Sequence, residues 1–291
     1  MKLATFTHDG FTRVGIITGN EVIDTRQLTG IPELMTDFLG ADLINSPTIR
    51  NMANTTIRRI PLDRVILEAP VLRPPKFLGI GLNYLDHIEE TGREKPSTPA
   101  VFNKQSTCVI GSGAAIHMPR VSDQLDYEGE LGIVIGKRCR HVPRDRARSV
   151  IAGYLAVNDV SVRDWQFRTP TWTLGKSFDT HGPIGPWIVT HDEIGDPHAL
   201  DIKTWLNEEL RQSSNTSNLL FDCYYLIEYL STVFTLEPGD IITTGTSSGV
   251  GALMEPQGYM KPGDVVKVEI EKIGAISNPV IPEPEETVVF A

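Results

Sequence analysis

Short apolar runs separated by turn-forming residues dominate the hydrophobic pattern of the chain. Apolar residues in alternating or continuous runs, bounded by Gly, Pro, Asn or Asp, predict β-strands. Such runs lie at residues 2–6, 13–17, 21–24, 77–81, 100–103, 128–136, 153–158, 186–190 and 265–270. Residues 202–206 and 209–212 flank Asn207-Glu208, which predicts a hairpin. The pattern therefore predicts a protein built mainly from strands.

Helical spacing is confined to a few segments. These are residues 32–39, 85–90, 144–150, 162–167 and 222–234. In the last segment Cys223, Leu226, Ile227 and Leu230 recur at the spacing of one helix face. Strands and helices do not alternate regularly, which argues against a doubly wound parallel sheet. We predict a strand-dominated α+β fold with a mixed β architecture.

Proline clusters mark a boundary early in the chain. Ala69-Pro70 and Arg73-Pro74-Pro75 interrupt the pattern, and consecutive prolines favour an extended linker. We expect a small N-terminal accessory domain at residues 1–71 and a main domain at residues 72–291.

Composition narrows the class of protein. The 291 residues carry a net charge of −10, which argues against a nucleic-acid surface. No apolar stretch approaches the roughly 20 residues that span a membrane, and residues 1–13 lack the apolar core of a signal peptide. The three cysteines show no zinc spacing. We expect a soluble protein of the reducing cytoplasm.

Three carboxylates form the most informative cluster. Glu128 and Glu130 start an apolar strand at a spacing of two, which places both on one face. Asp159 closes the next apolar run. Such carboxylates need a positive partner if they are buried, and a divalent cation is one candidate. The alternatives are a solvent-facing glutamate pair and an Asp159 that caps the helix predicted at 162–167.

Two further segments offer catalytic side chains. His87 and Glu90 lie three apart on the helix predicted at 85–90, so the carboxylate can orient the imidazole. The alternative is an ordinary exposed helix. Lys176 lies in an apolar, aromatic stretch, where it could bind an anion or stabilise an enolate oxygen, or else extend to the surface.

A glycine-rich segment at residues 243–251 follows a predicted strand. Its small residues allow backbone amides and hydroxyls to approach a carboxylate, unless the segment is only a flexible loop. It formally matches G-x-S-x-G, but no histidine follows Ser247, so a serine hydrolase of the α/β type is excluded. Gly79-Ile80-Gly81 lacks the third glycine of a dinucleotide-binding loop.

In this order the motifs resemble the fumarylacetoacetate hydrolase family, over roughly residues 72–278. The family pattern runs G-x-N-Y-x-x-H, E-x-E-L, an Asp closing a strand, R-D-x-Q, K-S-F and T-G-T-x-x-G-V-G. The matching residues are Asn83, Tyr84, His87, Glu128, Glu130, Leu131, Asp159, Arg163, Asp164, Gln166, Lys176, Ser177, Phe178, Thr244, Gly245, Thr246, Gly249, Val250 and Gly251. One departure is Leu82, which stands where relatives often carry Arg.

The resemblance implies a mixed β-sandwich roll, usually as a homodimer, with a small accessory domain in front. It also implies a metal site for Mg²⁺ or Mn²⁺, with Ca²⁺ as a third candidate. Its ligands would be Glu128, Glu130 and Asp159.

The same resemblance assigns roles to other residues. His87 and Glu90 would activate water from a mobile lid, and Lys176 would hold the enolate. The residues that would contact the substrate are Tyr84, Arg163, Gln166, Gly245 and Thr246.

The activity that the resemblance implies is metal-dependent hydrolysis of a carbon–carbon bond in a small 1,3-dioxo acid, such as an acylpyruvate from aromatic catabolism. Because His87 and Glu90 are both present, we expect hydrolysis first. Isomerisation of a hydroxymuconate-type diacid, decarboxylation of oxaloacetate and dehydration of a sugar acid use the same kind of site. A metal-binding protein without catalysis is the non-enzymatic alternative.

Overall fold

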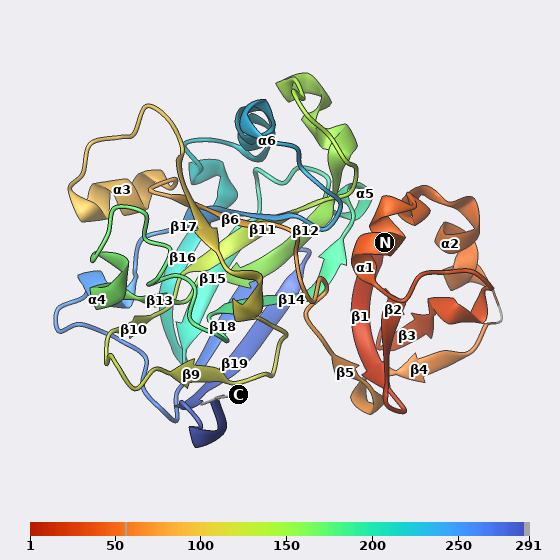
Figure 1. Ribbon diagram of the computed structural model, residues 1–291, viewed down its shortest axis with the longest axis horizontal. Helices are drawn as coiled ribbons and strands as arrows, with labels where there is room; N and C mark the ends of the chain where they lie inside the picture. The colour runs from red at the N-terminus through yellow and green to blue at the C-terminus, as the bar shows by residue number, and fades with distance from the viewer. Residues whose placement is uncertain (56, 288–291) are drawn as a thin grey trace, which may run out of the picture.

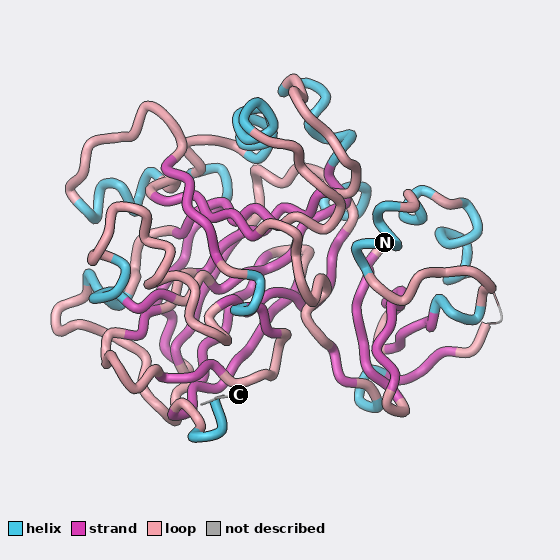
Figure 2. Tube along the Cα trace, viewed as in Figure 1, coloured by secondary structure: helices cyan, strands magenta, loops and turns pink. Residues whose placement is uncertain are grey.

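The computed structural model describes residues 1–55 and 57–287. Within them, most strands join one 12-stranded mixed sheet whose main path runs β4-β3-β2-β1-β14-β12-β11-β17-β6-β7 (Figures 1 and 2). Its strands are β1 (Lys2–His8), β2 (Phe11–Thr18), β3 (Glu21–Asp24), β4 (Arg59–Pro61), β5 (Ile66–Leu67), β6 (Phe77–Gly81), β7 (Ala100–Lys104), β8 (Val109–Ile110), β11 (Gly129–Ile135), β12 (Ile151–Asn158), β14 (Gly182–Val189) and β17 (Ile241–Thr246). The fold is thus strand-dominated and mixed, as predicted.

A second, five-stranded sheet packs against the first. It contains β9 (Ile116–Met118), β15 (Asp201–Leu206), β16 (Glu209–Asn215), β18 (Val265–Ile270) and β19 (Gly274–Pro282), and a small ribbon joins β10 (Leu125–Asp126) to β13 (Ser161–Val162). The α-helices are α1 (Met35–Gly40), α2 (Pro47–Asn51), α3 (Leu85–Thr91), α4 (Arg163–Gln166), α5 (His191–Ile194) and α6 (Cys223–Val233). In Figure 1, α3 and α4 lie on the side of the molecule opposite the N-terminal lobe, which is formed by β1–β5, α1 and α2.

Strand β11 is covered on both faces, as its continuous apolar sequence predicts. Ile133 and Ile135 pack into a core shared with α6 and the five-stranded sheet. Val134, pointing the other way, packs into a core shared with the N-terminal lobe. Alternate residues of this strand therefore tie both halves of the molecule together.

The N-terminal lobe continues the main sheet. Strand β1 pairs with β14 at Lys2↔Val189 and Leu3↔Ile188. Because the lobe shares sheet and core with the rest of the chain, the boundary between residues 71 and 72 stays a prediction.

Several predicted helices differ from the structure in length or in type. The predicted segment 162–167 forms only α4, because Val162 belongs to β13 and pairs with Leu125. Residues Arg144–Val150 form a 3-10 helix. Helix α6 begins directly after Asp222, whose carboxylate accepts hydrogen bonds from two backbone N–H groups of the first turn.

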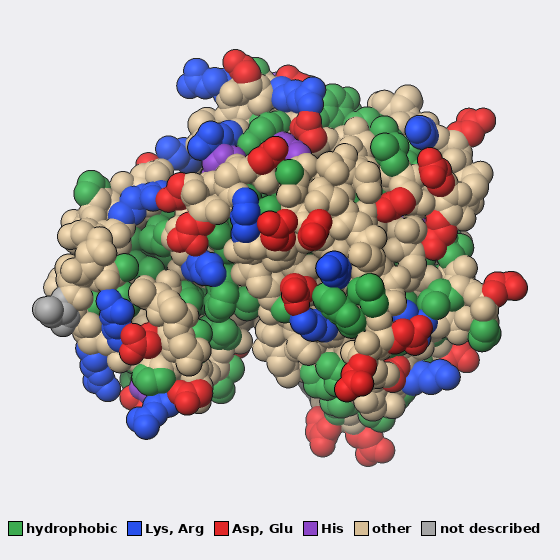
Figure 3. Space-filling model, turned by 180° about the vertical axis from the view of Figure 1, so that it is seen from behind, with side chains coloured by type: hydrophobic (Ala, Val, Ile, Leu, Met, Phe, Trp, Pro, Cys, Tyr) green, Lys and Arg blue, Asp and Glu red, His purple; other side chains and the backbone are tan. Residues whose placement is uncertain are grey.

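The surface mixes charges of both signs. On the face seen in Figure 3, Lys and Arg side chains are interspersed with Asp and Glu, which gives no extended basic surface on that face. Across residues 1–55 and 57–287, every helix is too short or too polar to cross a bilayer.

Candidate active site

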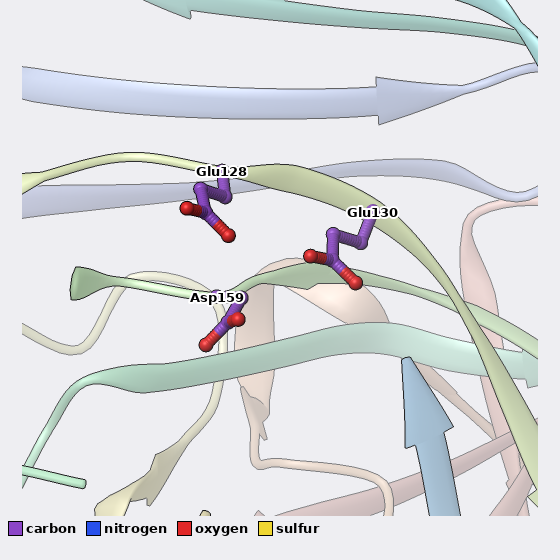
Figure 4. A group of neighbouring side chains, drawn as sticks. All are labelled: Glu128, Glu130 and Asp159. Carbon is purple, nitrogen blue, oxygen red and sulfur yellow. The ribbon is translucent and has the colours of Figure 1, made fainter. Parts of the chain in front are cut away.

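The antiparallel pairing of β11 with β12 brings the start of one strand to the end of the other. Gly129 pairs with Asn158, and the backbone N–H of Asp159 donates to the carbonyl of Glu128 over 2.8 Å. Figure 4 shows the side chains of Glu128, Glu130 and Asp159 turned towards a shared space. One oxygen from each carboxylate lies within 4.8 Å of the other two.

All three carboxylates are buried. The exposed fractions are 6% for Glu128, 1% for Glu130 and 0% for Asp159. The solvent-facing alternative for the glutamate pair is therefore wrong. The capping alternative for Asp159 is also wrong, because α4 follows Val162 and takes no side-chain cap. Buried like charges at this distance require positive charge nearby.

Three buried cations surround the cluster. The Nζ atom of Lys176 donates to Glu128 over 2.6 Å and to Asp159 over 2.7 Å. A guanidinium nitrogen of Arg163 lies 2.6 Å from the other oxygen of Glu128. Lys104 also contacts Asp159, with Nζ 2.6 Å from Oδ1. Lys176 is only 2% exposed, so its extension to the surface is excluded.

The two glutamates respond differently to burial. Burial raises the pKa of Glu128, but the charges of Lys176 and Arg163 outweigh it and lower that pKa to about 2. Burial also raises the pKa of Glu130, and the nearby charges of Asp159 and Glu128 raise it further. Glu130 has no ion-pair partner among the described residues, and it accepts a 2.7 Å hydrogen bond from the backbone N–H of Gly245.

The donor set fits a divalent cation. Three carboxylates offer hard oxygen ligands, which suit Mg²⁺, Mn²⁺ or Ca²⁺. The unpaired, buried carboxylate of Glu130 would gain the positive partner that it lacks. Glu128, Glu130 and Asp159 are the residues that would hold the ion.

Helix α3 places an imidazole beside this cluster. Nδ1 of His87 donates to Glu90 over 2.9 Å. The other oxygen of Glu90 accepts from the backbone N–H of Gly249, also over 2.9 Å. His87 lines the same cavity as Glu128 and Glu130. The helix therefore presents an oriented acid–base group to the cavity. An ordinary exposed helix would not account for this arrangement.

The cavity has a volume of about 390 Å³. Arg163, Gln166 and Thr246 line it, as does Lys176. Arg163 donates to the side-chain oxygen of Gln166 over 2.9 Å. The hydroxyl of Thr246 is fixed by the carbonyl of Gly129, to which it donates over 3.0 Å. The cavity wall therefore offers polar side chains that can form hydrogen bonds with a ligand.

Two predicted substrate contacts lie elsewhere. Tyr84 is fully buried in the core cluster under α6 and does not line the cavity, and its backbone pairs with that of Leu219. Gly245 also does not line the cavity: its N–H holds Glu130 instead. Residues 243–246 of this segment belong to the buried strand β17, so the flexible-loop alternative does not hold for them, whereas residues 247–250 form a loop.

Lys104 was not predicted from the sequence. It is buried, and besides Asp159 it contacts the carbonyl oxygen of Lys176. A usable signal exists in β7, where Phe102 and Lys104 alternate with exposed residues, so the lysine occupies an inward position.

Asp126 was not predicted either. Its carboxylate accepts from Nε of Arg163 over 2.8 Å and from the backbone N–H groups of Gly251 and Ala252 over 2.8 and 2.9 Å. It therefore fixes both the arginine and the loop that closes the cavity. No local pattern distinguishes it from a solvent-exposed aspartate.

A family model described as fumarylacetoacetate (FAA) hydrolase C-terminal matches residues 76–281. The rat protein named oxaloacetate tautomerase Fahd2a, mitochondrial, is 40% identical over 265 residues, which cover 90% of this chain and 85% of that protein.

Solved structures of two other proteins are similar to this chain over nearly its whole length. Maleylpyruvate hydrolase from Sphingobium sp. SYK-6, in complex with manganese(II) ion and pyruvate, is 33% identical with a TM-score of 0.82, covering 98% of this chain and 100% of that one. 2-Hydroxyhepta-2,4-diene-1,7-dioate isomerase from Mycobacterium marinum is 33% identical with a TM-score of 0.80 and the same coverage.

Proposed function

Because this chain belongs to the fumarylacetoacetate hydrolase family, we propose that it is a metal-dependent enzyme that moves a proton at the carbon beside the keto group of a small 2-oxo acid. Keto–enol tautomerisation of an oxaloacetate-type acid is the first candidate reaction. The observation that carries the proposal is the His87–Glu90 pair, held at the same cavity as the buried carboxylate cluster.

The charges of the site favour an anionic substrate. Four carboxylates (Glu128, Glu130, Asp159 and Asp126) face three cationic side chains (Lys104, Lys176 and Arg163). Among these buried groups one negative charge is in excess, and a bound divalent ion would leave one positive charge. A carboxylate group that binds beside this cluster then meets charge of the opposite sign.

Glu128, Glu130 and Asp159 would hold a divalent cation, which would supply Lewis acidity and stabilise negative charge that develops on the substrate. His87 performs the proton transfer: its Nδ1–H is engaged by Glu90, which leaves Nε2 to take the proton from the adjacent carbon. The buried ammonium of Lys176 favours the enolate over the ketone by charge. Return of the proton to the enolate oxygen gives the enol, and the reverse sequence gives the ketone.

Hydrolysis of a 1,3-dioxo acid is the second candidate. The maleylpyruvate hydrolase structure with manganese(II) and pyruvate favours it. Here His87 would deprotonate water, hydroxide would add to the distal carbonyl, and the carbon–carbon bond would break to give an acid and the enolate of pyruvate. We rank it second because the rat oxaloacetate tautomerase is more similar in sequence, at 40% against 33% identity.

A substrate panel separates the candidates. Protein freed of metal and then given Mg²⁺ or Mn²⁺ is mixed with enol-oxaloacetate and with acetylpyruvate. Metal-dependent loss of the enol absorbance, without release of pyruvate, supports the tautomerase. Release of pyruvate and acetate from acetylpyruvate, with no effect on oxaloacetate, supports the hydrolase and overturns the first candidate.

A further inference from the structure

Arg93 is a cation at the mouth of the active-site cavity that the enolate chemistry does not use. It follows α3 directly after Gly92, which ends the helix in a left-handed conformation with φ 65°. Its side chain is exposed and lines the same cavity as His87. It makes no hydrogen bond or ion pair with any of the described residues. An arginine in this position is free to bind a ligand.

The other cations that line the cavity are already engaged. Lys176 is held between Glu128 and Asp159. Arg163 is held between Asp126 and Glu128. Both lie at the floor of the cavity with the carboxylate cluster, where the 2-oxo acid end of the substrate reacts. A second anionic group on the substrate has to find its partner elsewhere.

One side of the cavity is unfavourable for a second anionic group of the substrate. Asp164 lines this side together with Gln257 and Tyr259. Burial raises the pKa of Tyr259, and so do the nearby carboxylates of Asp126, Asp123 and Asp164, which outnumber the guanidinium of Arg163 that lowers it. A carboxylate would be repelled here.

We infer that Arg93 binds the distal carboxylate of a dicarboxylic 2-oxo acid and thereby makes the enzyme selective for diacids. The guanidinium presents two parallel N–H groups that match a carboxylate. This inference rests on the proposed function, and it names the substrate class of the same site. Because Arg93 follows α3, the contact also ties the tail of the substrate to the helix that carries His87.

The test compares two ligands that differ at the distal group, which is a charged carboxylate in oxaloacetate and a neutral ester in its 4-methyl ester. Turnover is measured for the wild type and for Arg93→Met, Arg93→Lys and Arg168→Met. Arg168 is the control because it lies beside the site, stacked 3.7 Å above Trp165, but does not line the cavity. Its 3.5 Å ion pair with Asp164 joins partly exposed side chains, so its loss should change the charge felt in the cavity only slightly. Dissociation constants of both ligands are also measured for the Mg²⁺-loaded protein in a His87→Ala background, where binding is read without turnover.

In Arg93→Met, kcat/KM for oxaloacetate should fall roughly 10- to 100-fold, mainly through KM, because a charge-assisted hydrogen-bonded pair is lost. The methyl ester should change less than about twofold, as should both ligands in Arg168→Met. Arg93→Lys should recover part of the loss, since it keeps the charge but not the paired donors.

An equal loss for both ligands would overturn the inference, because it would indicate a role in positioning α3. An unchanged preference for oxaloacetate, or a wild type with no preference, would overturn it too. If the wild type turns over neither ligand, yet Arg93→Met abolishes the binding preference for oxaloacetate, Arg93 keeps its assignment and the proposed reaction falls. If turnover is normal and the preference survives in Arg93→Met, the reaction stands and the inference falls.

Discussion

At the scale of single residues, the site combines groups that are costly to bury with partners that make their burial possible. Glu128 remains ionised because Lys176 and Arg163 outweigh its desolvation. Lys176 is kept charged in the same way: burial lowers its pKa, but the carboxylates of Asp159 and Glu128 outweigh burial and raise it. Each charge therefore depends on its neighbours, and single substitutions should have distinct effects.

Replacing His87 by Ala should remove proton transfer and leave the metal ligands intact. We expect kcat to fall by about 10²- to 10⁴-fold, the usual contribution of a positioned acid–base group. Affinity for Mn²⁺, measured by calorimetry, should stay close to that of the wild type, because His87 is bonded to Glu90 and not to the carboxylate cluster. A parallel loss of turnover and metal affinity would contradict these roles.

Replacing Lys104 by Met should destabilise the metal-free protein. The change removes one of the two lysines that pair with Asp159. Because Lys176 remains, we expect the loss of stability to lie below the roughly 3–5 kcal/mol that an uncompensated buried charge costs. A bound divalent ion would offset part of the lost positive charge, so saturating Mn²⁺ should narrow the difference in melting temperature between variant and wild type. A difference that Mn²⁺ does not narrow would show that Lys104 does not share Asp159 with the ion.

At the scale of elements, α3 and the loop after β17 are joined by hydrogen bonds beside the cavity. Glu90 joins His87 to the backbone N–H of Gly249. At the other end of the helix, the hydroxyl of Ser214 donates to Asp86 over 2.6 Å. The position of the imidazole therefore depends on a loop that contributes no acid–base side chain of its own.

Replacing Gly249 by Ala should displace this loop. Gly249 has φ 100°, and a Cβ there would lie 2.0 Å from the carbonyl oxygen of Arg211. We expect kcat to fall at least about tenfold as the contact with Glu90 is lost. Gly263→Ala is a matched control, because Gly263 has φ 97° and a Cβ added there would meet no atom within 4 Å. Equal effects of the two substitutions on kcat would contradict the account.

The elements also show what the sequence could predict. The alternation and apolar content of β11 and β12 predicted both strands, and a spacing of two placed Glu128 and Glu130 on one face. Lys104 and Asp126 were not predicted, because their partners lie far away in the sequence and only the folded sheet brings them together. Tyr84 lies in the core under α6, and a motif match alone does not tell which way such a side chain points.

At the scale of the whole molecule, the main sheet joins the N-terminal lobe to the active site. Strand β1 pairs with β14, β14 with β12, and β12 with β11. The metal-ligand candidates Glu128, Glu130 and Asp159 lie where β11 begins and β12 ends. The site is therefore supported by cores on both faces of one sheet. Local sequence patterns cannot predict that β1 pairs with β14, more than 180 residues away in the sequence. Because this pairing joins the lobe to the main sheet, the domain boundary at residue 71 stays a prediction.

Acid should destabilise the folded protein partly through His181. Burial lowers the pKa of His181 from 6.5 to about 3, so the folded state keeps it neutral while the unfolded state takes up a proton below pH 6.5. Its contribution to stability is therefore full above pH 6.5 and is lost as the pH falls towards 3. Between pH 6 and pH 4, wild-type unfolding free energy should fall more steeply than that of His181→Gln, by up to about 1.4 kcal/mol per pH unit. Parallel slopes in denaturant titrations would contradict this.

The most direct test of the account is the rate at which enol-oxaloacetate is converted to the ketone by protein of verified metal content. The wild type stripped of metal should be close to the uncatalysed rate and should recover on addition of Mg²⁺ or Mn²⁺, whereas Glu130→Gln should not recover at the same metal concentration. Full activity in protein shown by mass spectrometry to contain no divalent metal would contradict the assignment of Glu128, Glu130 and Asp159 and the mechanism built on it.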